Sequence, residues 1–333
     1  MSRLIPSKAT WTMLKRFALA LATGVTLLAQ GNAQAQLGDR PIKFILPVAT
    51  ASGVDTITRA AQPALSKALG APVIVDNQPG AGGIVGTSAL VKSAPDGNTL
   101  SIVSNNHVIY PSVYKALPFD PIADITPIAV IGSTPIVIVV NPKVPAKNAQ
   151  ELIALLKANP GKYNYGSSGN GTILHLAAEM FFDEAGVKAT HVPYKGVGPM
   201  LTDLIGGQVE IGALALPSVQ QHLKAGTLRA IGVGAAQRVP AAPDIPTMVE
   251  QGLPNYLVEG WFAVIGPAKL PPDDVKRIHD AFATAFATAE VREAMAKQGN
   301  TINVSTTEYA GEFFRSELAK YAKLVKKAGL ELQ

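Results

Sequence analysis

The chain has 333 residues, a length that allows two domains with sizeable cores. It contains no cysteine, which excludes disulfide bonds, thiol catalysis and cysteine-ligated zinc. Residues 1–35 hold four of its 29 basic residues and none of its 24 acidic ones, leaving 25 against 24 in the remainder. This near-neutral balance, without basic clusters, argues against nucleic-acid binding.

Residues 1–35 have the pattern of a secretory signal peptide. Basic residues precede an apolar stretch over residues 17–29, and Ala33-Gln34-Ala35 supplies a small-x-small cleavage pattern. The apolar stretch is too short to span a bilayer comfortably, which favours a cleaved signal over an anchor. We therefore expect a periplasmic protein whose mature chain starts at Gln36.

The first predicted unit is strand–helix–strand. An apolar run over residues 41–47 predicts a buried strand, and a loop of small polar residues follows it at 48–55. The next helix has one apolar face and is expected to kink at Pro63 and to end at Gly70. A second strand at residues 72–76 completes a unit that is typical of a parallel sheet.

A glycine-rich segment at residues 80–86 superficially matches a dinucleotide-binding loop. Asn77-Gln78-Pro79 separates it from the strand, and an exported protein meets little nicotinamide cofactor. The alternative, a tight turn with close helix–sheet packing, is favoured, and no cofactor is expected.

Further α/β elements follow. Ser104–His107 comes directly after a strand, at the end where open α/β sheets bind ligands. We predict strands at 99–103, 128–131, 136–140, 163–165, 209–214, 228–233 and 259–267, and helices at 150–158, 217–225, from 271 and at 307–327.

The stretch Tyr165–His175 combines Gly, Ser and Asn with the start of a helix that Gly186 is placed to end. A helix start leaves backbone N–H groups unpaired and carries partial positive charge, so it suits a carboxylate. A plain capped helix is the alternative interpretation. His175, on that helix, either orients the loop by hydrogen bonding or is a structural histidine.

Several motifs together resemble the solute-binding receptors of tripartite tricarboxylate transporters, also called the Bordetella uptake gene family. No single motif is diagnostic, but their order extends over nearly the whole chain. They are Pro47–Asp55, Asp76–Gly83, Ala94–Gly97, Gly166–His175, His191–Gly207, Pro246–Gly252 and Trp261.

The resemblance implies an α/β periplasmic binding protein of the type II-like class, with two lobes, two crossing strands and a ligand cleft between the lobes. The expected crossings lie near Ile136 and Glu259. Lobe 1 would hold residues 36–137 plus 259–333, and lobe 2 residues 138–258. Closure of the lobes would bury the ligand by a hinge motion.

The resemblance also implies which segments bind the carboxylate. They are the loop after the first strand, residues 48–55, and the Ser-Gly-x-Gly helix start, residues 167–172. Asn106, Pro193, Tyr194 and Leu214 are added from other loops and strand ends. Asp55 is expected to cap the first helix or order its loop rather than touch an anion. The predicted ligand-binding residues are Val48, Ala49, Thr50, Ala51, Ser52, Gly53, Asn106, Ser167, Ser168, Gly169, Asn170, Gly171, Thr172, Pro193, Tyr194 and Leu214.

Two departures from the family pattern bear on the ligand. Ala51 and Ser52 replace a usual Gly-Gly pair, and Leu214 replaces an aspartate that usually enters the pocket. Loss of that polar group favours a ligand with an apolar middle, such as terephthalate or a similar dicarboxylate. Alternatively, Leu214 faces the core and says nothing about the ligand.

Other functions find less support. The sequence has no nucleophile elbow, no His-Glu-x-x-His motif and no histidines at metal-ligand spacing, which argues against an exported enzyme. No catalytic residue or metal is therefore expected. A periplasmic sensor for a two-component system would have the same fold and pocket. We expect a monomer that binds a small carboxylate and contacts membrane transporter subunits transiently.

Overall fold

The computed structural model describes residues 40–330, and the predicted signal peptide lies outside this range. Residues 41–330 belong to one compact unit. Its strands are β1 (Ile42–Leu46), β2 (Val73–Asn77), β3 (Thr99–Val103), β4 (Ile125–Val140), β5 (Asn164–Ser167), β6 (Thr190–Pro193), β7 (Ile211–Ala215), β8 (Arg229–Val233), β9 (Glu259–Pro267) and β10 (Thr301–Ile302).

Helices surround these strands. They are α2 (Gly53–Leu69), the short 3₁₀ helix η1 (Ala81–Gly83), α3 (Ile84–Val91), α4 (Asn106–Val113), α5 (Ala149–Ala158), α6 (Ile173–Ala185), α7 (Val197–Gly206), α8 (Leu216–Lys224), α9 (Pro272–Ala287), α10 (Ala289–Gln298) and α11 (Thr307–Lys327).

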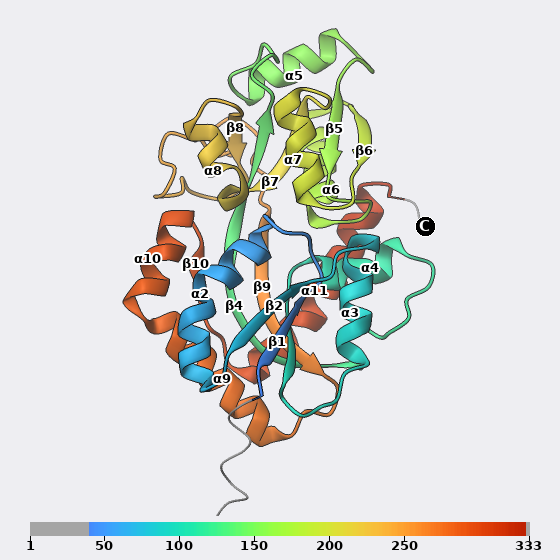
Figure 1. Cartoon of the computed structure of the whole chain (residues 1–333). Coiled ribbons are helices and arrows are strands. Elements are labelled where there is room, and N and C mark those ends of the chain that lie inside the picture. The colour runs from blue at the N-terminus through green and yellow to red at the C-terminus, as the bar shows by residue number, and fades with distance from the viewer. Residues whose placement is uncertain (1–39, 331–333) are drawn as a thin grey trace, which may run out of the picture. The chain divides into compact units, whose positions relative to one another are not determined.

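The strands form a ten-stranded mixed sheet in the order β2-β1-β3-β9-β4-β7-β5-β6, with β8 and β10 also paired to β4 (Figure 1). Parallel pairs link β1 to β2 and β3, and β5 to β6 and β7, whereas β9 is antiparallel to β3 and β4. The chain is therefore a two-lobe α/β fold. We call β1, β2, β3, β9, β10 and residues 125–135 of β4, with α2–α4 and α9–α11, the first lobe. The second lobe is residues 136–140 of β4 with β5–β8 and α5–α8.

Helix α2 shows how local sequence fixes an element. Ser52 is its N-cap and accepts a hydrogen bond from the Asp55 amide, while Gly70, at φ +67°, ends it in the left-handed conformation. On its apolar face, Ile57 and Leu65 are fully buried. The helix is continuous over residues 53–69, with Pro63 inside it.

Strand β4 connects the lobes. The sequence predicts two separate apolar strands, at 128–131 and 136–140. That prediction is wrong, since one 16-residue strand pairs with β9 up to Pro135 and with β7 from Ile136. Pairing with β9 before Pro135 and with β7 after it keeps the chain extended across the proline.

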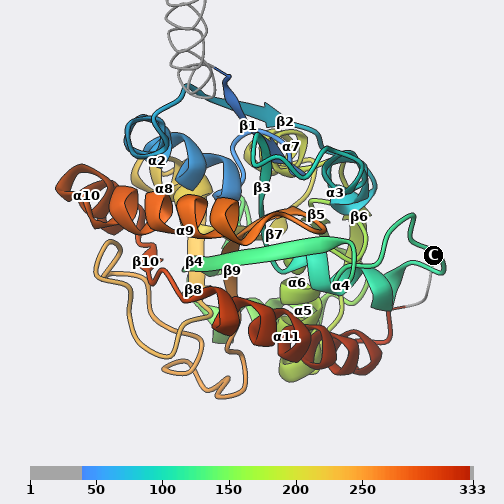
Figure 2. The same ribbon diagram turned by 90° about the horizontal axis from the view of Figure 1, so that it is seen from below.

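The second connection lies just before β9. The Val258 N–H donates to Gly234 O at 2.9 Å, next to the end of β8, and β9 begins at Glu259 in the first lobe. Near these connections, α11 packs against β4 and α4. Figure 2 shows α9 and α11 on opposite sides of β4. Lys327 of α11 pairs with Asp183 of α6 at 3.4 Å, so this helix reaches the second lobe.

Candidate ligand cavity

A cavity of about 590 Å³ lies where the two lobes meet. Residues after the carboxyl ends of β1 and β3 line its first-lobe side, together with the glycine segment 79–83. Residues after β5, β6 and β7 line the other side. Its floor includes Thr134 and Ile136 of β4 and Gly260 and Phe262 of β9. This is the position where open α/β sheets bind ligands.

Several helices begin at the cavity. The starts of α2, α6 and α7 line it, at Gly53, Ile173 and Val197, and so does Ala215, the N-cap of α8. Each helix start carries unpaired backbone N–H groups and roughly half a positive charge from the aligned peptide dipoles. The convergence of these starts gives the cavity a positive potential without many charged side chains.

The lining strengthens this electrostatic bias. Among the described residues that line the cavity, none is Asp or Glu, and Lys195 is the single Lys or Arg. Tyr194 also lines it, but its hydroxyl donates to Asp203 Oδ2 at 2.8 Å. The cavity therefore suits an anion, and the lysine in its lining, Lys195, is exposed to solvent.

The loop after β1 is ordered by Asp55, as predicted. Ala51 has φ +63°, a conformation rare for alanine, and its N–H donates to Asp55 Oδ2 at 3.1 Å. Arg59 and Asn77 both donate to Asp55 Oδ1, at 2.8 and 3.0 Å. The carboxylate of Asp55 is thus committed to the loop and to Arg59, and Ser52 is the helix cap.

The start of α6 follows Ser167–Thr172, which we call the anion loop. The Ile173 N–H donates to Asn106 Oδ1 at 2.8 Å, and the His175 N–H donates to Thr172 Oγ1 at 3.4 Å. The Leu174 N–H has no acceptor among the described residues, and Leu174 lines the cavity. The helix start therefore opens to the cavity, although Asn106 occupies one of its amides.

Two hydrogen bonds join the lobes beside the cavity. One is the bond from Ile173 of α6 to Asn106 of α4. The other runs from Ser218 Oγ of α8 to Ala51 O at 2.7 Å. Both bonds run from the second lobe to the first, so the two lobes are in direct contact beside the cavity.

Most of the predicted ligand-binding residues border this cavity. Those that do are Val48, Ala49, Ser52, Gly53, Asn106, Ser168, Gly169, Asn170, Thr172, Pro193 and Tyr194. Thr50, Ala51, Ser167, Gly171 and Leu214 do not. Thr50 and Ala51 are exposed, whereas Ser167 and Gly171 are the buried residues of the anion loop that do not reach the cavity.

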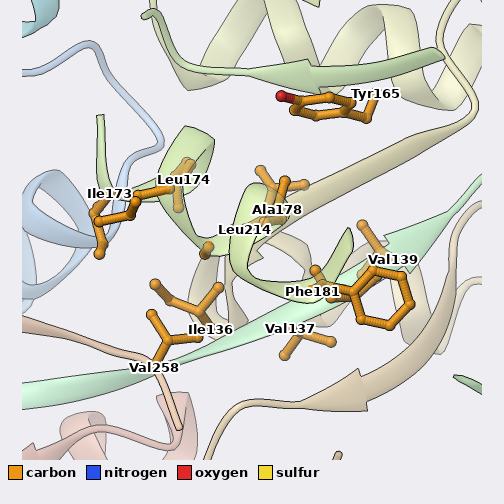
Figure 3. Close-up of a cluster of buried hydrophobic side chains, with 14 of the residues drawn as sticks. Ile136, Val137, Val139, Tyr165, Ile173, Leu174, Ala178, Phe181, Leu214 and Val258 are labelled. Carbon is orange, nitrogen blue, oxygen red and sulfur yellow. The ribbon is translucent and has the colours of Figure 1, made fainter. Parts of the chain in front are cut away.

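The structure contradicts the expectation that Leu214 lies in the pocket. Leu214 is fully buried in a hydrophobic cluster with residues such as Ile136, Leu174 and Ala178 (Figure 3). Its neighbour Ala215 lines the cavity instead. Successive residues of a strand point to opposite faces, so a pattern match at position 214 could not fix which one meets the ligand.

The floor of the cavity and part of its wall were not predicted from the sequence. Thr134, Ile136, Gly260 and Phe262 alternate along β4 and β9, and this period of two was a usable signal once the crossings were recognised. Ser218 carried no such signal, because its place at the cavity depends on how α8 packs.

Buried histidines predict a pH-dependent stability. Burial lowers the pKa of His107 to about 4, of His175 to about 3 and of His191 to about 4, from 6.5. Below pH 6.5 the unfolded chain then binds more protons than the folded one, so the free energy of unfolding should fall as pH decreases toward 4 and be insensitive to these groups above 6.5. Fully buried His107 should contribute about 1.4 kcal/mol per pH unit.

Urea denaturation at pH 7.5, 6 and 5 measures this slope. His107 is fully buried and packs against Phe119 and Phe314, and its Nε2 lies 2.7 Å from Pro121 O. His107→Phe should keep the ring packing at the cost of that hydrogen bond, and should reduce the slope by the contribution of His107. An unchanged slope in that variant would contradict the assignment.

Two structural findings bear on other functions. No group of three or more His, Cys, Asp or Glu residues placed to hold a metal ion occurs within residues 40–330. Over the same range, no helix is long and apolar enough to cross a membrane.

Comparison with known proteins identifies the relatives of this fold. Residues 57–330 match the family described as tripartite tricarboxylate transporter family receptor. Protein BugT of Bordetella pertussis is 34% identical over 296 residues, which cover 88% of this chain and 91% of BugT.

Solved structures agree with the sequence match. Rpa4515 of Rhodopseudomonas palustris with adipate is 28% identical, with a TM-score of 0.86, and the match covers 90% of this chain and 100% of that one. MatC of R. palustris with bound malate is 25% identical, with a TM-score of 0.81, over 86% and 99% of the two chains.

Proposed function

The chain belongs to the tripartite tricarboxylate transporter receptor family, and we propose that it captures a small carboxylate in the periplasm for such a transporter. The observation that carries this proposal is the cavity between the lobes. Several helix starts converge on it, and its described lining includes no carboxylate side chain. An anionic ligand would meet backbone N–H donors from both lobes at once.

The ligand is proposed to be a dicarboxylate with an apolar middle, and terephthalate is the sharpest candidate. Adipate and malate, the ligands named for two related structures, are both dicarboxylates. Because Leu214 lies in the core, it gives no information about the ligand. Ile136, Val197 and Phe262 line the cavity and offer an apolar surface for the middle of the ligand. A benzene ring or a short methylene chain would pack against them while carboxylates meet the helix starts.

Capture is proposed to work by closure of the two lobes. The boundaries expected from the sequence, residues 36–137 with 259–333 and residues 138–258, put the first crossing two residues later in β4 than the strand pairing does. The hydrogen bonds from Ser218 to Ala51 and from Ile173 to Asn106 would form only in the closed state. The ligand then supplies the differential contacts that favour this state. The protein would act as an exported monomer that meets the membrane subunits transiently.

Thermal and chemical denaturation with added ligand tests the proposal. A true ligand at about 100 times its dissociation constant should add about 2.7 kcal/mol to the free energy of unfolding. We would screen citrate, malate, glutamate, adipate and terephthalate, with hexanoate and 4-methylbenzoate as monocarboxylate controls. Failure of every dicarboxylate and tricarboxylate to stabilise the protein would contradict the proposed function.

Trp261 provides a second signal in the same titration. It lies at the crossing, is 6% exposed, and donates from Nε1 to Glu317 Oε2 at 2.8 Å. After loss of residues 1–35 it is the only tryptophan left of two. Since it does not line the cavity, a ligand-dependent change in its fluorescence would report movement of the hinge rather than direct contact.

A further inference from the structure

Two stacked imidazoles lie behind the anion loop. His175 of α6 and His191 of β6 have ring centroids 3.8 Å apart and planes within 11° of parallel. Neither ring lines the cavity, and the proposed binding step uses neither. Both nevertheless make hydrogen bonds to the loop that does line it.

Each imidazole holds one end of the anion loop. The Gly171 N–H donates to His175 Nδ1 at 3.1 Å, and Ser167 Oγ lies 2.7 Å from His191 Nε2. Ser167 Oγ also accepts from the Gly169 N–H at 3.2 Å and donates to Gly169 O at 3.1 Å, which leaves Nε2–H of His191 as the donor in its bond to Ser167. The N–H groups of Gly169 and Gly171 are thereby paired within the protein, while Ser168, Gly169 and Asn170 line the cavity.

We propose that His175 and His191 are a positioning pair that selects which anion-loop amides face the ligand: His175 supplies an uncharged hydrogen-bond acceptor behind a site for anions, and His191 stacks on it and bonds to Ser167. This inference rests on the proposed function. Aspartate or glutamate could accept the same hydrogen bond, but its negative charge would repel a carboxylate a few residues away. A neutral imidazole accepts without that charge.

The surroundings keep the pair neutral. Because Nδ1 of His175 accepts from Gly171, its ring proton must be on Nε2, which lies 4.0 Å from Glu179 Oε1. Tyr165 stacks on His191 at 4.8 Å, and its hydroxyl bonds to Glu179. Among the residues that the structure describes, Tyr165 and Glu179 are the titratable groups with an interaction to the pair. Burial lowers the pKa of both imidazoles, to about 3 for His175 and about 4 for His191, and His191 further disfavours a charge on His175.

Three substitutions of His175 separate the acceptor from its charge. Asparagine places Oδ1 near the position of Nδ1, aspartate has the same shape with a negative charge, and leucine has no acceptor. With adipate, malate and terephthalate as probes, His175→Asn should bind within about threefold of the unsubstituted protein. His175→Asp and His175→Leu should each weaken binding at least tenfold. His175 is the third residue of α6, where aspartate favours a helix, so loss of helix stability would not explain weaker binding by His175→Asp.

The matched control is His279 of α9, which lies outside the cavity lining and bonds through Nε2 to Ser305 O. The same three substitutions there should leave ligand affinity unchanged. If the unsubstituted protein binds none of the probes, the proposed function fails and this inference falls with it. If it binds them and His175→Asp binds as well as His175→Asn, only the positioning role is overturned.

A ligand-independent measurement complements these titrations. Nitrogen-15 NMR of the imidazoles should find His175 neutral, with its proton on Nε2, from pH 5 to 8. The Gly171 amide resonance should move in His175→Leu and stay near its original position in His175→Asn. A proton on Nδ1 of His175 at pH 7 would overturn the proposal whatever the ligand.

Discussion

Asn170→Asp is expected to reduce carboxylate affinity by roughly two orders of magnitude. Asn170 lies on the anion loop and lines the cavity, so the substitution would place a negative charge beside the bound carboxylate with almost no change in shape. Two like charges about 5 Å apart at an effective dielectric constant of about 20 repel by roughly 3 kcal/mol. Isothermal titration with adipate and terephthalate measures the loss.

The same substitution should leave the folded state intact. An acidic residue just ahead of α6 interacts favourably with the helix start, so the melting temperature without ligand should be unchanged or slightly higher. Asn170→Ala is the matched control, because it removes the side-chain amide without adding charge and should weaken binding far less. Equal affinities for the two variants would show that the ligand carboxylate does not lie at this loop.

Leu214→Asp is expected to destabilise the protein severely. Leu214 is fully buried in the core of the second lobe, where its described neighbours are apolar (Figure 3). An aspartate there would be an unpaired buried charge and would leave unfilled space, at a combined cost of about 4 kcal/mol or more. Urea denaturation, or the fraction of soluble protein where the variant does not fold, measures the effect.

Leu214→Met supplies the comparison, since a swap of similar volume should cost less than about 1.5 kcal/mol. It should also leave ligand affinity unchanged, because Leu214 does not border the cavity. If Leu214→Asp folded with nearly normal stability and lost only ligand binding, the placement of this residue in the core would be wrong.

Much of the fold was predictable from local patterns. Helix α11 occupies the predicted residues 307–327, and Gly70 and Gly186 end their helices at φ +67° and +63°. The anion loop was predicted because Gly, Ser and Asn precede an apolar helix period. These features depend on residues within a few positions of one another, so the sequence carries them directly.

Two strands, β6 and β10, were not predicted because they have no recognisable local pattern. β6 and β10 have only four and two residues, too few for a period of two to be recognised. β6 exists because Thr190–Pro193 pairs in parallel with β5, and β10 because Thr301–Ile302 pairs with β4. Pairing partners distant in the chain, rather than local propensity, define both elements.

The sequence by itself determined the family, the α/β order of elements and the helix start that faces the ligand cavity. Only the tertiary structure decided that Ala215 rather than Leu214 borders the cavity, and that His191 stacks on His175 behind the loop. The physical reason is that periodicity and capping arise between near neighbours in the chain. Which face of a strand meets a ligand, and which rings stack, depends on the register of strands that come together from distant parts of the sequence.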